Sequence, residues 1–370
     1  VPLNLLGTAQ VDNIPLTQVA TVTGVYGVSF AIMVVNASFA AAILLPKARR
    51  RAVLLASLSG AAALQAGMLA NPPAAPSSHT AVLLQHNISL EDVRWTAERF
   101  NQTLNEISAV SAETAARNVG KGNPQLIAWP ESPAPFYETD PHFRRHVSSL
   151  AVATGSYVVV GDMALQPSPR PGRRHQALNS ASLFAPDGNW VTRYDKIHLV
   201  PFGEYVPYEK LLFFAGTITR EVGDFGRGSE RKLLPVGDHR IGLFICYESV
   251  FPGEVREFAA GGADVLMNIS NDTWLDGTRG PEQHLNMARM RAIENRRWLL
   301  RPTNTGITAS IDPYGRMVAQ APRGERTALE APYGFISETT FYTRHGDVFA
   351  WTCAIISIAA VMSTFRRKQA

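Results

Sequence analysis

Long, uniformly apolar segments lie at both ends of the chain, and the region between them alternates short apolar runs with polar ones. Three apolar segments are long enough, or nearly long enough, to cross a bilayer: 19–45, 52–69 and 348–365. The two shorter ones lie near the lower length limit, so a buried helix is the alternative, but basic residues flank both. The pattern predicts an N-terminal loop with two transmembrane helices in residues 1–70, a large domain in 71–347, and a C-terminal transmembrane helix with a basic tail in 348–370.

Within residues 71–347, β-rich runs alternate with stretches of helical spacing. We expect strands at 80–88, 125–129, 156–165, 177–184, 189–196, 232–236, 241–245, 263–270, 298–305, 306–312 and 316–320. We expect helices at 90–119, 140–154, 250–260 and 281–297, the last with Pro281 at its first position. This alternation predicts an α/β fold in which stacked sheets are covered by helices.

Basic residues are concentrated in two clusters beside the apolar segments. They are Lys47, Arg49, Arg50 and Arg51 in the first cluster and Arg366, Arg367 and Lys368 in the second. If all three segments span the membrane, both clusters lie on one side, which the positive-inside rule makes the cytoplasm, and the large domain is extracytoplasmic. The formal net charge of +4 becomes −3 without these seven residues, so the charge pattern favours a membrane partner and argues against a nucleic-acid partner.

The strand expected at 241–245 ends at Cys246 and is followed by helical spacing. A nucleophile on a strand-to-helix turn is exposed beside unpaired backbone N–H groups that could hold an oxyanion. The alternative is a buried structural cysteine. Only one other cysteine exists, Cys353 in the last apolar segment, so we expect no disulfide and a free thiol at Cys246.

Two charged residues also follow expected strands. Glu131 comes just after Pro130 at the C-terminal edge of a core strand, where α/β enzymes gather their chemistry. Lys196 precedes an apolar, proline-rich stretch. Taken alone, Glu131 has the alternative of a solvated acid at a strand end, and Lys196 that of a surface lysine. We expect no metal site, because His142 and His146 have helical spacing but lack the glutamate of the metalloprotease pattern.

The order and spacing of Glu131, Lys196 and Cys246 resemble those of the nitrilase (carbon–nitrogen hydrolase) superfamily. The motifs WPES, KIHLVPFGEYVP, ICYES, SNDTWLDG, QHLNMARMRAIENRR and TNTGITASIDPYG are similar to those of the apolipoprotein N-acyltransferase family. The resemblance runs from Val1 to the final apolar segment. It implies a nitrilase-like α-β-β-α sandwich inserted between transmembrane helices, and further membrane helices ahead of Val1.

The resemblance also implies an activity and a location. We expect a multi-pass protein of the bacterial inner membrane that transfers a fatty acyl chain from a phospholipid to the N-terminal cysteine amine of a diacylglyceryl apolipoprotein, through a thioester on Cys246. Glu131 is the expected base, and Lys196 is expected to stabilise the oxyanion with the Tyr247 backbone N–H and to favour the thiolate. We expect a monomer without a cofactor. A membrane-tethered amidase with the same triad, or a non-catalytic lipid-binding scaffold, is the alternative.

Other residues match family positions or suggest a binding surface. Glu204 is expected to hold Lys196 or the substrate amine, and Glu248 to orient the loop behind Cys246; a surface salt bridge is the alternative for each. Trp95 matches a substrate-binding position, with packing on the core as the alternative. Tyr247 and Trp274 are expected to be pocket walls. An apolar run that includes Phe213 and Phe214 predicts a mobile lid over 206–228 that dips into lipid headgroups.

Overall fold

Seven strands form the first sheet of the computed structural model, which describes residues 4–66, 72–88, 95–117, 125–131, 134–169, 172, 174–207 and 225–367. The strands are β1 (His79–Gln85), β2 (Leu126–Ala128), β3 (Tyr157–Pro167), β4 (His175–Phe184), β5 (Trp190–Asp195), β6 (Phe225–Gly226) and β13 (Thr327–Tyr333). Their order is β13-β1-β2-β3-β4-β5, and β6 pairs with β4. Strands β1, β2 and β3 are parallel, whereas β3, β4 and β5 are antiparallel.

Six strands form the second sheet, in the order β12-β11-β10-β9-β8-β7. They are β7 (Leu233–Val236), β8 (His239–Ile245), β9 (Val265–Ile269), β10 (Leu299–Arg301), β11 (Ala309–Ile311) and β12 (Met317–Gln320). Strands β8, β9 and β10 are parallel neighbours at the centre of the sheet, and all of β9 is buried. A strand buried on both faces reads as a continuous apolar run, which explains why this region was predictable.

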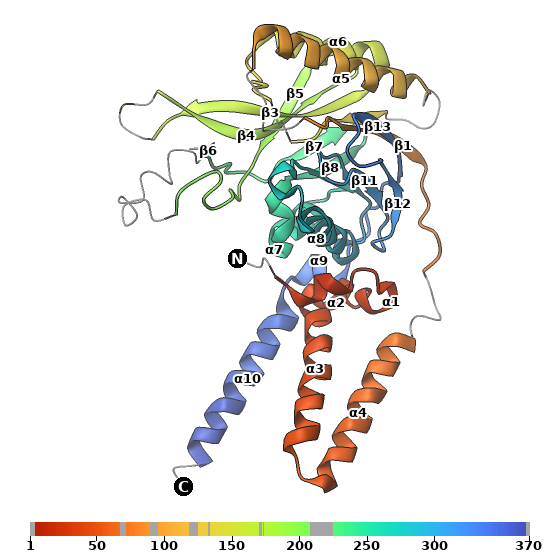
Figure 1. The fold of residues 1–370 in the computed structure, drawn as a ribbon, viewed down its shortest axis with the longest axis vertical. Coiled ribbons are helices and arrows are strands. Elements are labelled where there is room, and N and C mark those ends of the chain that lie inside the picture. Colours follow the sequence, from red (N-terminus) through yellow and green to blue (C-terminus); the bar gives the residue numbers. More distant parts are fainter. Residues whose placement is uncertain are drawn as a thin grey trace.

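Helices cover the outer faces of the two stacked sheets (Figure 1). α5 (Ala97–Arg117) and α6 (Pro141–Thr154) lie over the first sheet, and α7 (Pro252–Ala260) and α8 (Gly280–Asn295) over the second. Alternate residues of β1 serve different layers: Leu83 faces the core between the sheets, and Leu84 faces α5. The predicted α-β-β-α sandwich is therefore confirmed.

Seven further helices of the described residues lie outside the sandwich, and two short helices lie in the loops of the sandwich. Seven are η1 (Leu6–Gln10), α1 (Ile14–Thr17), α2 (Ala20–Thr23), α3 (Val25–Leu44), α4 (Lys47–Ala66), α9 (Phe341–His345) and α10 (Val348–Arg367); the loop helices are η4 (Cys246–Val250) and η5 (Thr273–Leu275). Among the described residues, two helices are long and apolar enough to cross a membrane, Val25–Leu44 and Val348–Phe365. α4 covers most of the predicted span at 52–69, and a spanning role for it stays a prediction.

The single span predicted at 19–45 is interrupted at Gly24, which corrects the sequence-based prediction. Gly24 has a φ of +65°, and it separates α2 from α3. A Cβ at this position would lie 2.5 Å from the Tyr342 ring. Only glycine combines a left-handed backbone with so close an approach, so the chain turns here before it enters the apolar helix.

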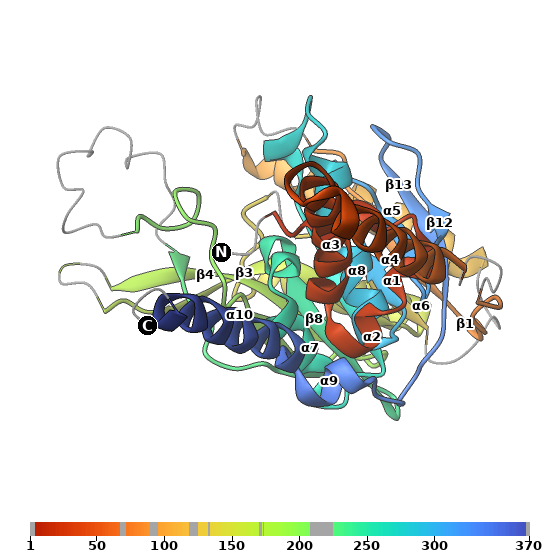
Figure 2. The ribbon, with the colours of Figure 1, turned by 90° about the horizontal axis from the view of Figure 1, so that it is seen from below.

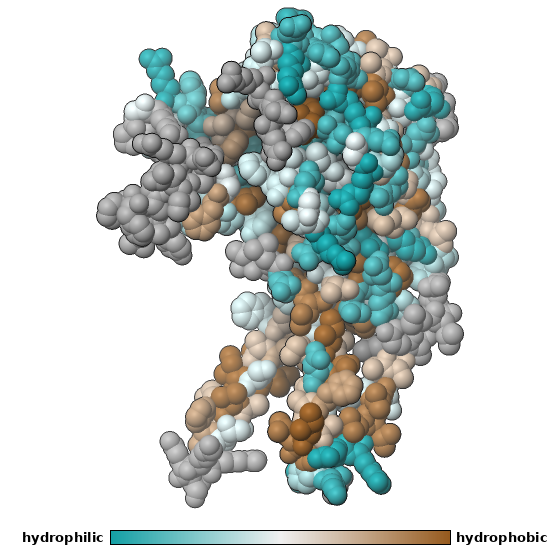
Figure 3. All heavy atoms as spheres, viewed as in Figure 1, coloured by the Kyte–Doolittle hydropathy of each residue, from teal (hydrophilic) through white to brown (hydrophobic). Residues whose placement is uncertain are grey.

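The helices α3, α4 and α10 project from one side of the sandwich; α10 starts against α3, where Phe349 packs on Phe30, and then diverges from it (Figures 1 and 2). Hydrophobic residues gather along these helices, and hydrophilic residues cover much of the sandwich (Figure 3). The turn between α3 and α4 and the end of α10 lie at the same far end (Figure 1). The first turns of α4 carry Arg49 to Arg51, and α10 ends at Arg366 and Arg367, so basic residues mark the end of the molecule opposite the sandwich.

The first apolar helix is attached to the sandwich by a buried contact. Val11, Leu16, Ala20, Val25 and Val28 form one apolar cluster with Met290 and Ile293 of α8. The carboxylate of Glu294, which is fully buried, accepts a hydrogen bond of 2.8 Å from the Val25 N–H at the start of α3. An acid at a helix N-terminus is electrostatically favourable, and this one joins α8 directly to α3.

Candidate active site

The three stretches with candidate chemistry meet between the two sheets, at the C-terminal ends of their strands. Glu131 follows β2, Lys196 follows β5, and Cys246 follows β8. β2 and β5 belong to the first sheet and β8 to the second. The sandwich therefore brings together residues that lie more than a hundred positions apart in sequence.

Lys196 is shared by two carboxylates. Its Nζ donates to Glu204 Oε1 at 2.9 Å and to Glu131 Oε1 at 3.2 Å, and its side chain is 1% exposed. Burial alone would lower the pKa of Lys196, but the charges of Glu131 and Glu204 outweigh it, so the pKa is raised. Lys196 is thus a permanent positive charge inside the site, and the surface-lysine alternative is wrong.

Glu131 is held by three donors. Oε1 accepts from Asn179 Nδ2 at 2.6 Å and from Lys196, and Oε2 accepts from the Asn271 N–H at 2.8 Å. The residue is 7% exposed, so it is not a solvated strand-end acid. Its carboxylate is held by these donors and lies close enough to Cys246 for its charge to raise the pKa of that thiol.

Cys246 has a φ of +50°, a conformation that residues with a side chain rarely adopt. It is the first residue of η4, where backbone N–H groups lack partners within the helix. Burial raises the pKa of the Cys246 thiol, the charge of Glu131 raises it further, and the charge of Lys196 acts in the opposite direction. Lys196 does favour the thiolate, but the other two effects outweigh it. The net effect is a raised pKa, which favours the thiol over the thiolate.

Glu204 and Glu248 support the site in different ways. Glu204 contacts Lys196 and accepts from the Val200 N–H at 2.7 Å, as the prediction that it holds Lys196 requires. Glu248 is fully buried and joins the segment around Lys196 to the strand that ends at Cys246. Its carboxylate accepts from Tyr194 Oη and from the backbone N–H groups of Ile197, His198 and Ile245. Burial raises the pKa of Glu248 to about 7, although these N–H donors oppose the rise.

The residues expected to line a substrate pocket are less well placed. Trp95 is half-buried and packs against the core beneath α5, with its ring centroid 6.4 Å from that of Phe136, as the packing alternative describes. Tyr247 is half-exposed, with its ring against Phe251. Trp274 is 83% exposed on η5. Phe213 and Phe214, with most of the expected lid, lie outside the described residues. Substrate contacts of all five stay predictions.

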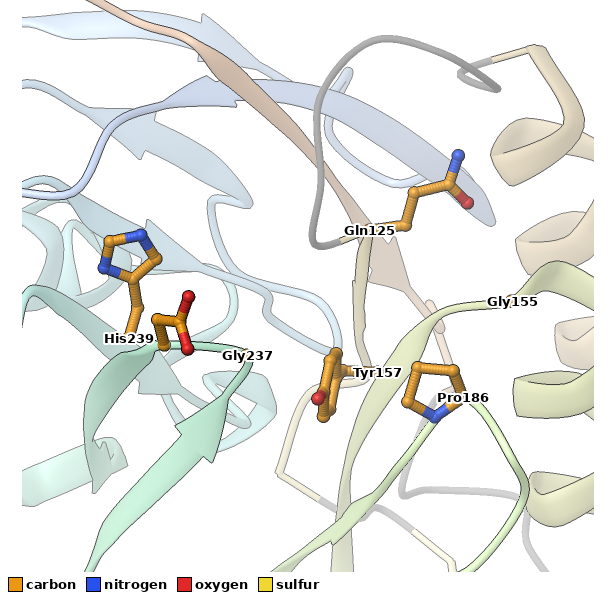
Figure 4. Close-up of a pocket in the computed structure, with 7 residues that line it drawn as sticks. Gln125, Gly155, Tyr157, Pro186, Gly237 and His239 are labelled. Carbon is orange, nitrogen blue, oxygen red and sulfur yellow. The ribbon is translucent and has the colours of Figure 1, made fainter.

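A cavity of about 340 Å³ lies at the opposite end of the strands (Figure 4). Gln125 and Tyr157 line it from the starts of β2 and β3, and His239 from the start of β8. The seven residues of β8 span about 20 Å, and Cys246 follows their far end. This cavity is therefore separate from the candidate active site.

Several polar residues around Cys246 were not identified from the sequence as site residues. Asn179 of β4 donates to both Glu131 and Glu204. Asp272 and His284 have ligand-type atoms within 4.8 Å of each other and of the Cys246 sulfur, the kind of cluster that can hold a metal ion. However, the Arg301 guanidinium lies 2.9 Å from Asp272 and would repel a cation. The motif SNDTWLDG contained Asp272, but only the fold shows what it contacts.

Two known families match the chain. The carbon–nitrogen hydrolase family matches residues 80–332, and the N-terminal domain of apolipoprotein N-acyltransferases matches residues 1–38. The chain is 36% identical to the apolipoprotein N-acyltransferase of Geobacter metallireducens over 99% of its own length and 70% of that protein. It is 33% identical to that of Bradyrhizobium diazoefficiens over its whole length and 70% of that protein.

Solved structures show the same sandwich. A carbon–nitrogen hydrolase from Helicobacter pylori G27 superposes with a TM-score of 0.50 at 18% identity, covering 70% of this chain and 89% of that one. A mutant of the amidase from Nesterenkonia sp. AN1 superposes with a TM-score of 0.50 at 20% identity, covering 74% and 98%. Likeness at this level of identity concerns the fold alone.

Proposed function

This chain belongs to the apolipoprotein N-acyltransferase family of acyltransferases, and from that membership we propose that it moves a fatty acyl chain from a membrane phospholipid to the N-terminal amine of a diacylglyceryl apolipoprotein. The observation that carries this proposal is the contact between Glu131 and Lys196 beside Cys246, in a domain attached to apolar helices. The arrangement supplies a base, a fixed positive charge and a nucleophile for acyl transfer.

In the first step, the Cys246 sulfur attacks the ester carbonyl of the phospholipid while its proton passes to Glu131. The carbonyl oxygen becomes negatively charged, and Lys196 with the Tyr247 backbone N–H stabilises it. The carbon–oxygen bond then breaks, and the lysophospholipid leaves with the proton returned by Glu131. Because the pKa of Cys246 is raised, little thiolate exists before substrate binds, and Glu131 is needed to accept the proton of the thiol.

In the second step, the lipoprotein amine attacks the thioester, and Glu131 accepts the proton that the amine loses. The carbon–sulfur bond breaks, and Glu131 passes the proton to the departing sulfur, which restores the thiol of Cys246 and the carboxylate of Glu131. The same three residues therefore serve both steps, as a two-step exchange through one covalent intermediate requires.

We also propose that the protein sits in the bacterial inner membrane with the sandwich on the outer side. Two apolar helices of spanning length and the two basic clusters at the far end from the sandwich support this orientation. The active site then lies on the side of the membrane to which lipoproteins are exported.

The test is incubation of the full chain, in membranes, with a phospholipid that carries a labelled acyl chain. We expect label on Cys246 in the wild type, its transfer to a diacylglyceryl peptide with a free N-terminal cysteine, and no label in Cys246→Ala. In Cys246→Ser, turnover should fall at least about 1000-fold, because a hydroxyl is far less acidic than a thiol. Hydrolysis of small amides without any labelled enzyme would instead identify an amidase.

A further inference from the structure

The side chain of His284 makes a hydrogen bond to the carbonyl oxygen of Cys246. The proposed mechanism does not use His284. His284 Nε2 lies 3.0 Å from this oxygen, and because a carbonyl can only accept, Nε2 is the donor. Asn268 Nδ2 makes a second, longer contact of 3.5 Å with the same oxygen. His284 is 7% exposed on α8, and Asn268 is fully buried on β9.

His284 is itself held in one orientation. Its Nδ1 lies 2.8 Å from Asp272 Oδ1, and Asp272 also accepts from Ser270 Oγ at 2.7 Å and from Arg301 Nη2 at 2.9 Å. Asp272 and Arg301 are both buried. Arg301 also donates to Asn268 Oδ1, so the contacts close a ring from Asn268 through Arg301, Asp272 and His284 to the Cys246 carbonyl.

The room for this ring is provided by a glycine. A Cβ on Gly306 would lie 2.2 Å from Asp272 Oδ2, closer than two atoms can approach. The loop after β10 therefore needs a residue without a side chain at this position if Asp272 is to face His284. Asn268 of β9 and His284 of α8 thus contact the Cys246 carbonyl oxygen. Asp272, Arg301 and Gly306 determine how these two side chains are held.

The Cys246 carbonyl and the Tyr247 N–H belong to the same peptide group. That group is planar and trans, so its oxygen and its N–H point in opposite directions. A side chain that fixes the oxygen on the buried side directs the N–H toward the opposite side. Cys246 has a left-handed backbone, a strained conformation that persists only where the surrounding structure holds it.

We propose that His284, oriented by Asp272, is a positioning residue that holds the Cys246–Tyr247 peptide so that the Tyr247 N–H faces the developing oxyanion. The inference rests on the proposed function, because it concerns the same acyl-transfer step. His284 does not touch the substrate in this scheme. Its effect passes through the peptide group, and it should appear only in reactions that build negative charge on a carbonyl oxygen.

The experiment compares two reactions of Cys246 in the full-length chain. Acylation by p-nitrophenyl butyrate forms a tetrahedral oxyanion, whereas alkylation by iodoacetamide displaces iodide directly and needs no oxyanion donor. We expect His284→Leu to slow acylation by about 10- to 100-fold, mainly through kcat, while the plateau rate of alkylation, measured where the thiol is ionised, changes by less than about twofold. His284→Gln, which can place an amide N–H near Nε2, should recover most of the acylation rate.

His146→Leu, a histidine substitution on the outer helix α6, is the matched control and should leave both rates unchanged. Equal acylation rates in His284→Leu and the wild type would overturn the inference. A parallel loss of alkylation would overturn it too, because His284 would then act on the thiol or on folding. Transfer from labelled phospholipid is measured separately: if it is absent while p-nitrophenyl butyrate still acylates the wild type, the proposed function fails and the role of His284 stands or falls on the two rates.

Discussion

Lys196 and Glu131 contact each other, yet they act on the Cys246 thiol with opposite signs. The charge of Glu131 raises the pKa of the thiol, and the charge of Lys196 lowers it. Glu131, the proposed base, therefore disfavours ionisation of the thiol from which it is proposed to accept a proton.

This opposition predicts two alkylation profiles that shift in opposite directions. In Glu131→Gln, the pH midpoint for alkylation of Cys246 by iodoacetamide should fall, because a negative charge beside the sulfur is removed. In Lys196→Met, the midpoint should rise, because the compensating positive charge is lost. Both variants should lose acyl-enzyme formation. Midpoints that move in the same direction would contradict the charge assignment.

At the residue scale, the sequence motifs were enough to single out Glu131, Lys196, Cys246, Glu204 and Glu248, which the fold brings into one region; their catalytic roles stay predictions. Each carries a reactive or charged group in a distinctive short motif. Asn179 and His284 were not found, because an asparagine in a strand and a histidine in a helix usually have no role in chemistry. Their importance lies in which atoms they face across the sandwich, and only the fold determines that.

Gly24 shows how one residue defines two elements. Its positive φ ends α2, and the Tyr342 ring occupies the space that a side chain would need. We expect Gly24→Ala to lower the free energy of unfolding by about 2–4 kcal/mol, from backbone strain and from steric overlap with the ring.

The matched control is Gly60→Ala. Gly60 lies within α4 with nothing inside 4 Å of an added Cβ, so this change should be neutral or stabilising by up to about 1 kcal/mol. Thermal unfolding of the two variants in the same detergent measures the difference. An equal loss of stability in both would show that the left-handed turn at Gly24 is not what matters.

Asp162 of β3 predicts how stability depends on pH. It is 1% exposed, and burial raises its pKa to about 8, with Glu138 and Asp195 adding to the rise and Ser182 and Arg193 opposing it. The folded state therefore keeps a proton that the unfolded state releases above about pH 4. Its contribution to stability is complete below pH 4 and is lost as the pH rises toward 8, by about 1 kcal/mol per pH unit.

Asp162→Asn should flatten this dependence, because an amide of the same shape carries no titrating proton. Urea unfolding at several pH values between 4 and 8 would compare the slopes of the two proteins. Parallel slopes would mean that Asp162 is ionised in the folded state.

Elements with a strong apolar period were predictable, and those defined by tertiary contact were not. The buried strand β9 and the helix α8 lie close to their predicted ranges. β13 was missed, because most of its residues are only half-buried and it includes Pro332, so no clear alternation exists. The break at Gly24 was missed because the sequence cannot show that the ring of Tyr342, more than 300 residues later, occupies the space that a side chain at position 24 would need.

The proposed orientation predicts on which side of the membrane the end of α10 and the sandwich lie. The first turns of α4, which carry Arg49 to Arg51, and the end of α10 both lie at the far end from the sandwich (Figure 1). A protease site inserted after Arg367 should be cut in inside-out vesicles and protected in right-side-out vesicles. A site inserted in the 186–188 turn should behave in the opposite way. Cleavage of both sites from one side would contradict the proposed orientation.

The buried contact between α8 and the start of α3 has a further consequence. The Glu294–Val25 hydrogen bond and the apolar cluster around Met290 hold α8 firmly against the start of the apolar helix α3. α8 is also the helix that carries His284. In the proposed orientation, this contact fixes the distance between Cys246 and the lipid surface. We therefore expect phospholipid donors to react at rates that depend on how readily each can raise its ester bond out of the bilayer to reach the thiol.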